Sequence, residues 1–207
     1  MPSTSTTTEP LSWALAVTHA ARHEFAALIA ALPDAERTAV GELKHWSPKD
    51  EIAHLAYWIE VFVSNIQAQR EGRPLIDTRP YLAMNDAAWE VRRAWTWGEV
   101  EAATAATLGQ LEMLLQNMSA DDLTDPQRFT IEPLRTAPRP LIRSLLYELV
   151  DHPVHHFTGL YRKISDPDGM SAMLVRYDAV LQKRGTSQWT ATTRKKIKAA
   201  AQALSAS

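Results

Sequence analysis

The chain has 207 residues, 45% hydrophobic and 22% charged, which is ordinary for one soluble globular domain. Its formal net charge of −2 gives no electrostatic footprint for nucleic acid or an anionic membrane surface, so we expect neither partner. The absence of cysteine excludes disulfides, thiolate nucleophiles and thiolate metal ligands, which leaves imidazole and oxygen chemistry for any site.

The N-terminal segment, residues 1–9, lacks the basic and apolar regions of a signal peptide. No apolar run approaches the ~20 residues that span a bilayer. We therefore expect residues 1–9 to be disordered and the protein to be cytoplasmic. Alanine and leucine are frequent, glycine is scarce, and no alternating β-branched run is long enough for a strand, so the remainder is predicted to be all-α.

Apolar residues recur at helical spacing in two long segments of the N-terminal half. The first predicted helix spans residues 10–32. The second starts after Ser47 as N-cap, with Pro48 at its first position and Asp50 three residues after the cap, and Gly72 closes it. The predicted buried stripes are Ala14, Val17, Ala21, Phe25, Leu28 and Leu32 in the first helix, and Ile52, Leu55, Ile59, Phe62 and Ile66 in the second.

A short helical piece is predicted over residues 85–93. Thr96 and Glu99 form a capping box for a third long helix that reaches Met118. Residues 119–139 are polar and proline-rich, and are predicted to be a crossover loop. The apolar residues of the third helix are Leu108, Leu111, Met113, Leu114 and Leu115.

The fourth long helix is predicted to open at Pro140 and to run to about Ile164. A turn at residues 166–169 then separates it from two further helices, over residues 173–181 and 190–204.

Four long helices with one long loop between the third and the fourth predict an up-and-down four-helix bundle over residues 10–165. Residues 166–207 are predicted to form a short C-terminal helical extension packed on or beside this bundle. No repeat or linker divides the chain further.

Two histidines interrupt the apolar stripe of the fourth helix. Leu145 and Leu149 precede His152 and His156, and Leu160 follows, at the spacing of a bundle seam. An imidazole removed from water needs a partner, because an unsatisfied buried polar group costs roughly 1–3 kcal/mol. Two imidazoles one helical turn apart can share one metal ion.

His54 flanks the buried stripe of the second helix. If the second and fourth helices are neighbours, it meets His152 and His156, and three imidazoles leave the open position of a catalytic metal site. The alternative is a set of satisfied core or rim histidines without a metal. His155 is ambiguous, since it can replace His152 as a ligand or point to the adjacent groove.

The remaining histidines are predicted to face solvent. His19 and His23 lie about 200° around the first helix from its buried stripe, and His45 precedes the cap of the second helix.

Pro153 stands inside the predicted fourth helix, where proline removes a backbone hydrogen bond and clashes with the carbonyl of Leu149, at a cost of ~3 kcal/mol. We expect a kink there, and the backbone must either open or recruit a new partner for that carbonyl. The kink can belong to a functional site or be purely structural.

At these residues the chain resembles the DinB/YfiT-like superfamily of metal-binding four-helix bundles. The motifs that carry the resemblance are WSPKDEIAHLAYW at residues 46–58 and HPVHHFTGL at residues 152–160. The resemblance implies metal ligands at His54, His152 and His156.

The resemblance covers about residues 11–163, and residues 84–123 are further similar to the ClbS/DfsB branch. Two positions depart from the family pattern. Pro153 replaces a good helix former, which affects ligand geometry, and Phe157 stands where many members carry arginine, which weakens an argument for an anionic substrate. Relatives include thiol-dependent transferases or isomerases that use mycothiol or bacillithiol, and the ClbS-like branch is associated with self-protection against genotoxic metabolites.

The first functional hypothesis is an enzyme, either a metal-dependent hydrolase or a thiol-dependent transferase, acting on a small electrophilic or toxic metabolite. Its cofactors would be a divalent transition metal (zinc, nickel or iron) and a low-molecular-weight thiol. The alternatives are a non-catalytic protein that sequesters an apolar small molecule, and a bundle that serves oligomerisation. We also expect a homodimer.

Aromatic side chains near the histidines are candidate walls of a ligand pocket, and Glu148 is a candidate acceptor that orients His152 from one turn away. Their alternatives are ordinary core tryptophans and a solvated surface acid. The candidate pocket residues are Tyr57, Trp58, Trp89, Trp95 and His155.

Overall fold

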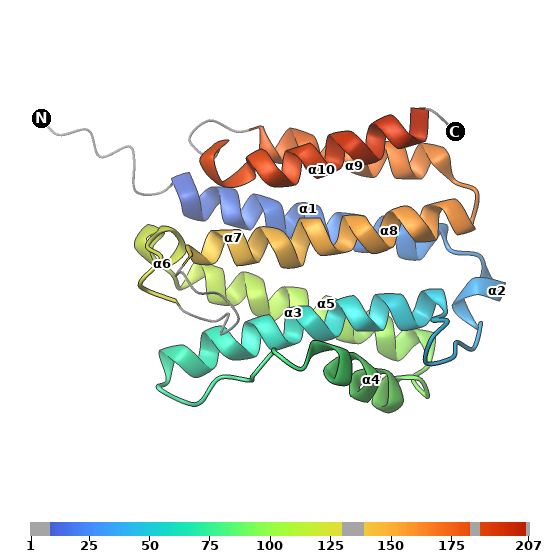
Figure 1. Ribbon diagram of the computed structural model, residues 1–207, viewed down its shortest axis with the longest axis horizontal. Helices are drawn as coiled ribbons and strands as arrows, with labels where there is room; N and C mark the ends of the chain where they lie inside the picture. Colours follow the sequence, from blue (N-terminus) through green and yellow to red (C-terminus); the bar gives the residue numbers. More distant parts are fainter. Residues whose placement is uncertain (1–8, 130–138, 183–186, 206–207) are drawn as a thin grey trace, which may run out of the picture.

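The computed structural model describes residues 9–129, 139–182 and 187–205, and its helices run along one long axis (Figure 1). The longer helices are α1 (Glu9–Ala31), α3 (Pro48–Arg70), α4 (Tyr81–Arg92), α5 (Trp97–Gln116), α8 (His152–Lys163), α9 (Pro167–Leu181) and α10 (Ser187–Ser205). The shorter ones are α2 (Asp34–Arg37), α6 (Ala120–Thr124) and α7 (Leu141–Leu146), and a π-helical turn, η1 (Tyr147–Asp151), joins α7 to α8. These described ranges hold no strand beyond one isolated bridge between Glu42 and His45, so the predicted all-α class is confirmed.

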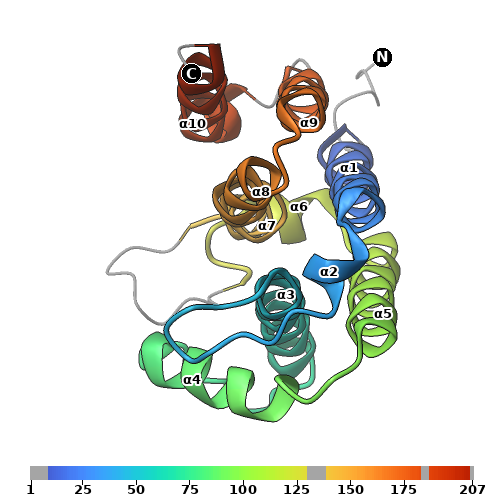
Figure 2. The same cartoon turned by 90° about the vertical axis from the view of Figure 1, so that its right-hand side faces the viewer.

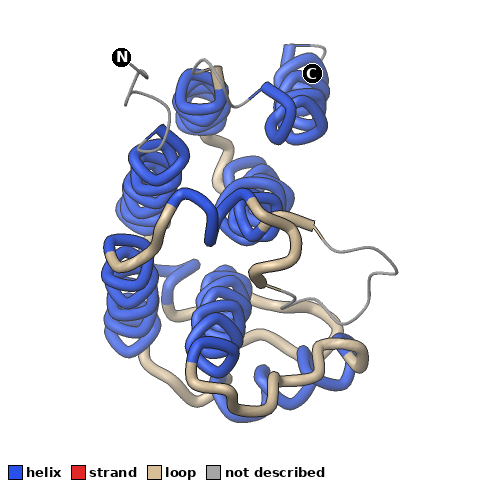
Figure 3. Tube along the Cα trace, turned by 90° about the vertical axis from the view of Figure 1, so that its left-hand side faces the viewer, coloured by secondary structure: helices blue, strands red, loops and turns tan. Residues whose placement is uncertain are grey.

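Seen along their axes, α1, α5, α3 and the continuous helix α7–η1–α8 lie side by side around a shared apolar core (Figure 2). Helices α9 and α10 form a further layer over α1 and α7–η1–α8, while α4 covers the outer side of α3 (Figure 3). Helix α4 begins at Tyr81, earlier than predicted, and α2 was not predicted because four residues are too few to show a period. None of the described helices is long and apolar enough to cross a membrane.

The two predicted stripes of the N-terminal half are confirmed, because every residue named for them is buried. The cap of α3 is confirmed as well: the Ser47 hydroxyl accepts a hydrogen bond from the Asp50 amide, and the Asp50 carboxylate accepts one from the Ser47 amide at 2.9 Å. Gly72 follows α3 with a φ of 67°, the left-handed conformation that ends many helices. Thr96 and Glu99 form a capping box of the same kind at the start of α5.

Three predictions for the C-terminal half were wrong in part. Ser119 and Asp122 form a third capping box, so the segment predicted as a loop begins with α6. Asp166 accepts a hydrogen bond from the Gly169 amide, so the predicted turn is the first turn of α9. The last helix, predicted over residues 190–204, begins earlier, at Ser187. Met113, one of the apolar residues named for the third helix, is exposed on α5. Residues 130–138 of the predicted loop lie outside the described residues, as do residues 1–8 of the predicted disordered segment, while Glu9 is already helical.

Helix α9 is held to α1 by an ion pair whose carboxylate is buried and whose guanidinium is partly exposed. Glu24 is fully buried, and its carboxylate accepts hydrogen bonds from Arg176 of α9 at 2.5 and 2.8 Å. Such a bidentate pair is among the stronger polar contacts in proteins. The Trp13 indole also donates to the carbonyl of Val180 at 2.9 Å. Both contacts bind the extension to the helix that begins the fold, so the extension is part of the same core.

Candidate metal site

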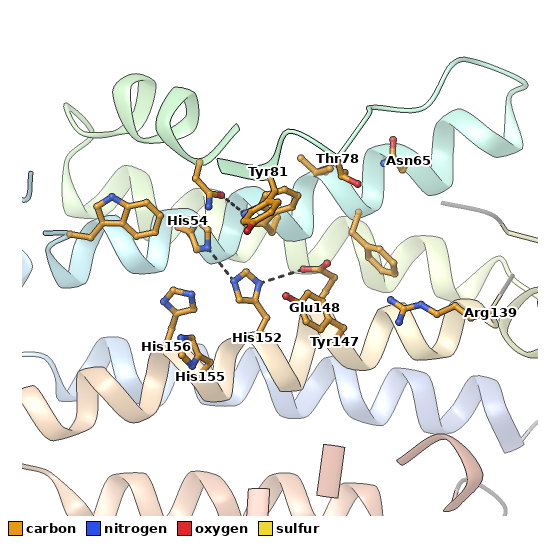
Figure 4. Close-up of a pocket in the computed structure, with 15 residues that line it drawn as sticks. His54, Asn65, Thr78, Tyr81, Arg139, Tyr147, Glu148, His152, His155 and His156 are labelled. Carbon is orange, nitrogen blue, oxygen red and sulfur yellow. Dashed lines mark hydrogen bonds and ion pairs between the residues drawn. The ribbon is translucent and has the colours of Figure 1, made fainter. Parts of the chain in front are cut away.

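Three histidines from two helices meet on the side of the core that faces α4. His54 comes from the second turn of α3, and His152 and His156 come from the start of α8 (Figure 4). One ring nitrogen from each lies within 4.8 Å of the other two, and the Nε2 atoms of His54 and His152 are 3.1 Å apart. The structure thus brings together the three imidazoles that the sequence motifs pointed to.

Pro153 is accommodated by the π turn that precedes it. Within η1 the amide of His152 donates to the carbonyl of Tyr147, five residues back, so the helix contains one residue more per turn before the proline. The carbonyl of Leu149 accepts a hydrogen bond from the Tyr177 hydroxyl of α9 at 3.0 Å. Of the two predicted alternatives, an opened backbone or a new partner for this carbonyl, the structure shows the new partner.

Carboxylates stand behind two of the three imidazoles. The Nδ1 atom of His156 lies 2.8 Å from Oε2 of Glu51, which is in the first turn of α3. The Nδ1 atom of His152 lies 3.7 Å from Oε2 of Glu148, which is too long for a hydrogen bond. Glu148 therefore stands beside His152, as predicted, without the direct hydrogen bond expected of an orienting acceptor, whereas the Glu51 contact was not predicted.

Burial shapes the protonation of this cluster. Burial, followed by the neighbouring His152 and His156, lowers the pKa of His54 to about 2, and burial with His155 lowers the pKa of His152 to about 4. Both rings are therefore neutral at physiological pH, which is the form of imidazole that binds metals. Burial also raises the pKa of Glu148 to about 8.

The residues present fit a divalent metal. Within the described ranges, the Nδ1 atoms of His54 and His152 are buried and lack a hydrogen-bond partner, which is unusual for polar atoms in a protein interior. Three imidazole nitrogens gathered in one place, with a carboxylate behind His156 to fix its tautomer, are a donor set for zinc, nickel or iron.

The histidines form one end of a cavity of about 700 Å³ between α3 and α7–η1–α8. The volume is in the range of ligand sites for small molecules. Trp58 and His155, both predicted pocket residues, line this cavity, and Arg139 lies at the end away from His156 (Figure 4). The lining residues that sequence analysis did not propose are Trp46, Val61, Phe62, Asn65, Thr78, Tyr81, Asn85, Arg139 and Tyr147.

Three predicted pocket residues do not line this cavity. Tyr57 and Trp95 instead pack on Arg92, whose guanidinium carbon lies 5.0 and 4.8 Å from their ring centroids. Trp89 borders a much smaller recess behind His54. For Tyr57 the cause is the one-residue step from Trp58, which turns a side chain by about 100° around the helix, so the two residues face different neighbours.

The structure also shows where the three histidines predicted to face solvent lie, and where Phe157, which departs from the family pattern, lies. His19, His23 and His45 are exposed, as predicted. Phe157 is fully buried and packs edge-on against Phe25 of α1, with ring centroids 4.9 Å apart. Because it faces the core and not the cavity, this position carries no information about the charge of a ligand.

A family model described as the DinB superfamily matches residues 18–158, more than half of the chain. The chain belongs to the DinB superfamily. Neither the search of curated proteins nor that of solved structures found a match.

The DinB match contains all three histidines and both carboxylates, Glu51 and Glu148. It ends at Thr158, within α8, so Tyr177 and the rest of α9 and α10 lie beyond it. The histidine cluster is therefore on the part of the chain that the superfamily shares, whereas the Tyr177 hydroxyl that contacts the Leu149 carbonyl is outside that part.

Replacing Glu51 with glutamine should weaken divalent metal binding about 10–100-fold, because the carboxylate behind His156 fixes its tautomer and raises its basicity. The measurement is competition for Zn²⁺ against a chromophoric chelator. Glu60→Gln is the matched control, since Glu60 is on the same helix but pairs with Arg92. Equal zinc affinity in both variants would mean that Glu51 does not support the site.

Proposed function

We propose that this DinB-superfamily protein binds one divalent transition metal at His54, His152 and His156 and acts on a small electrophilic metabolite. The observation that carries the proposal is the convergence of three imidazoles at the wall of a cavity large enough for a small molecule. A structural zinc site would instead be closed by a fourth protein ligand. Among the described residues, no fourth histidine or carboxylate ligand joins these three histidines.

The neighbouring side chains hold the imidazoles in place. Glu51 accepts the Nδ1 proton of His156, which leaves the Nε2 lone pair of that ring available. The Nε2 atom of His152 is already turned toward His54, while its Nδ1 atom faces Glu148. The rings are thus oriented before a ligand arrives, which reduces the reorganisation needed at the time of reaction.

A bound zinc, nickel or iron ion would supply Lewis acidity and lower the pKa of a water molecule or thiol. The chain has no cysteine, so a thiol would have to come from a low-molecular-weight compound. Hydrolysis and thiol transfer are therefore the two reaction classes that we propose. A place in the ClbS/DfsB branch, with its link to resistance against toxic metabolites, is part of the same proposal.

The cavity favours a flat, largely apolar ligand with one polar end. Trp58, Tyr81 and Tyr147 supply aromatic surface between the histidines and Arg139. The Tyr147 ring stacks on His152 with an interplanar angle of 17°, so aromatic surface continues up to the imidazoles. Arg139 places a positive charge at the opposite end, which suits a carboxylate or another electron-rich group.

A second candidate function is sequestration of an apolar small molecule without turnover. The same aromatic walls favour it, because stacking and apolar burial bind a flat ligand without any chemistry. The histidines would then serve to orient the ligand.

The two functions separate in assays with aromatic electrophiles. Protein loaded with Zn²⁺, Ni²⁺ or Fe²⁺ is incubated with 4-nitrophenyl acetate, or with 1-chloro-2,4-dinitrobenzene and a low-molecular-weight thiol, and product is followed by absorbance. We expect turnover that disappears on chelation and in His54→Ala, and persists in His45→Ala, whose histidine is exposed. Stoichiometric binding of these compounds without product would support sequestration and contradict the enzyme.

A further inference from the structure

Two residues of the C-terminal extension contact the five-residue π turn that precedes His152. The Tyr177 hydroxyl of α9 donates to the carbonyl of Leu149 at 3.0 Å, and Lys196 of α10 lies 2.6 Å from the Asp151 carboxylate. Leu149 and Asp151 both belong to η1. The turn is therefore tied to two helices that lie outside the DinB match.

The Tyr177 hydroxyl donates the hydrogen bond that the helix itself cannot donate to the Leu149 carbonyl. Pro153, four residues after Leu149, has no amide hydrogen to donate, and Leu149 is fully buried. A buried carbonyl left without a hydrogen-bond partner would destabilise the fold. The Tyr177 side chain is also fully buried, and burial, followed by Glu24, raises its pKa well above the usual value, so its hydroxyl stays protonated and donates.

The π turn determines where the imidazoles of α8 point. In an α-helix each residue advances the side-chain direction by about 100°, so the extra residue in η1 rotates all of α8 by that angle relative to α7. A return of this turn to regular α-helix would swing His152 and His156 by about 100° away from His54. Their meeting with His54 therefore depends on the π turn.

We propose that Tyr177, assisted by Lys196, is a positioning residue for the metal site: it holds the π turn through the Leu149 carbonyl and so keeps His152 and His156 directed at His54. The inference rests on the proposed metal site. It assigns to the C-terminal extension a role in metal binding, in addition to its packing on α1.

The test uses the full-length protein loaded with Co²⁺, whose visible absorption bands report the arrangement of the ligands. We expect Tyr177→Phe to weaken Co²⁺ binding about tenfold and to alter these bands, as loss of an indirect support does at other metal sites. Tyr161→Phe is the matched control, because Tyr161 is also a buried tyrosine but lies on α8 and contacts neither Leu149 nor Asp151 through a hydrogen bond that the structure records. A purely structural role for Tyr177 would lower the melting temperature and leave affinity and spectrum unchanged, which would overturn the proposal.

Lys196→Met provides a second variant that does not disturb the core, since Lys196 is half exposed. We expect about a two- to fivefold loss of Co²⁺ affinity, the range of a partly exposed ion pair, with Lys195→Met unchanged. If the wild type binds no Co²⁺, the proposed metal site itself is wrong. If the wild type binds Co²⁺ and Tyr177→Phe and Lys196→Met bind it equally well, only the positioning role is wrong.

Discussion

The His156→Ala variant is expected to lose specific binding of divalent transition metals, while the wild type binds about one ion per chain. His156 offers its Nε2 atom to the cluster and is oriented by Glu51 at 2.8 Å. Loss of an indirect support costs about 10–100-fold in metal affinity, so loss of a direct ligand should exceed 100-fold. His54→Ala should behave in the same way, because the cluster contains a single imidazole from α3. Isothermal titration calorimetry with Zn²⁺ measures both stoichiometry and affinity.

The controls for this experiment separate ligand loss from unfolding. His45→Ala removes an exposed histidine and should keep the stoichiometry of the wild type. Both site variants, and the chelated wild type, should keep their helical circular dichroism, because the apolar core persists without the ion. Unchanged stoichiometry and affinity in His54→Ala and His156→Ala would show that the metal binds elsewhere.

Replacing Arg176 with methionine should lower the free energy of unfolding by about 3 kcal/mol, the low end of the range for removal of one partner from a buried ion pair. The carboxylate of Glu24 is fully buried, and among the described residues its other ion-pair partner is the exposed His23, at 3.3 Å. For a chain of this size the melting temperature should fall by about 6–12 °C. Differential scanning calorimetry measures the change.

An ion pair on the surface serves as the control for this change in the free energy of unfolding. Arg22 pairs with Glu112 at 2.6 Å on exposed surface, so Arg22→Met should change the free energy of unfolding by less than about 1 kcal/mol. The double variant Glu24→Leu with Arg176→Met should regain much of the lost stability, since it leaves no buried charge. Equal effects of Arg176→Met and Arg22→Met would mean that the Glu24 pair does not hold the extension to α1.

Local patterns in the sequence were sufficient for the long helices and for two of the three histidines. The buried stripes of α1 and α3 follow from an apolar residue every three or four positions, and their burial is confirmed. The caps at Ser47 and Thr96 involve residues three apart, so they form wherever the helix forms. His152 and His156 share a face for the same reason.

Contacts between distant segments depended on the tertiary structure. Glu51 meets His156 across 105 positions of sequence, and no local spacing signals such a pair. Trp46, Tyr81 and Arg139 line the cavity because α3, α4 and α7 approach there, whereas Tyr57 turns toward Arg92.

The π turn shows where local and tertiary determinants meet. Pro153 predicted the loss of one helical hydrogen bond, the one to the Leu149 carbonyl, because proline has no amide hydrogen. Proline alone does not decide between a kink and an inserted residue. The structure has the inserted residue of a π turn, and the partner of the Leu149 carbonyl is the Tyr177 hydroxyl of α9, a contact between distant segments that depends on the packing of α9 on α8.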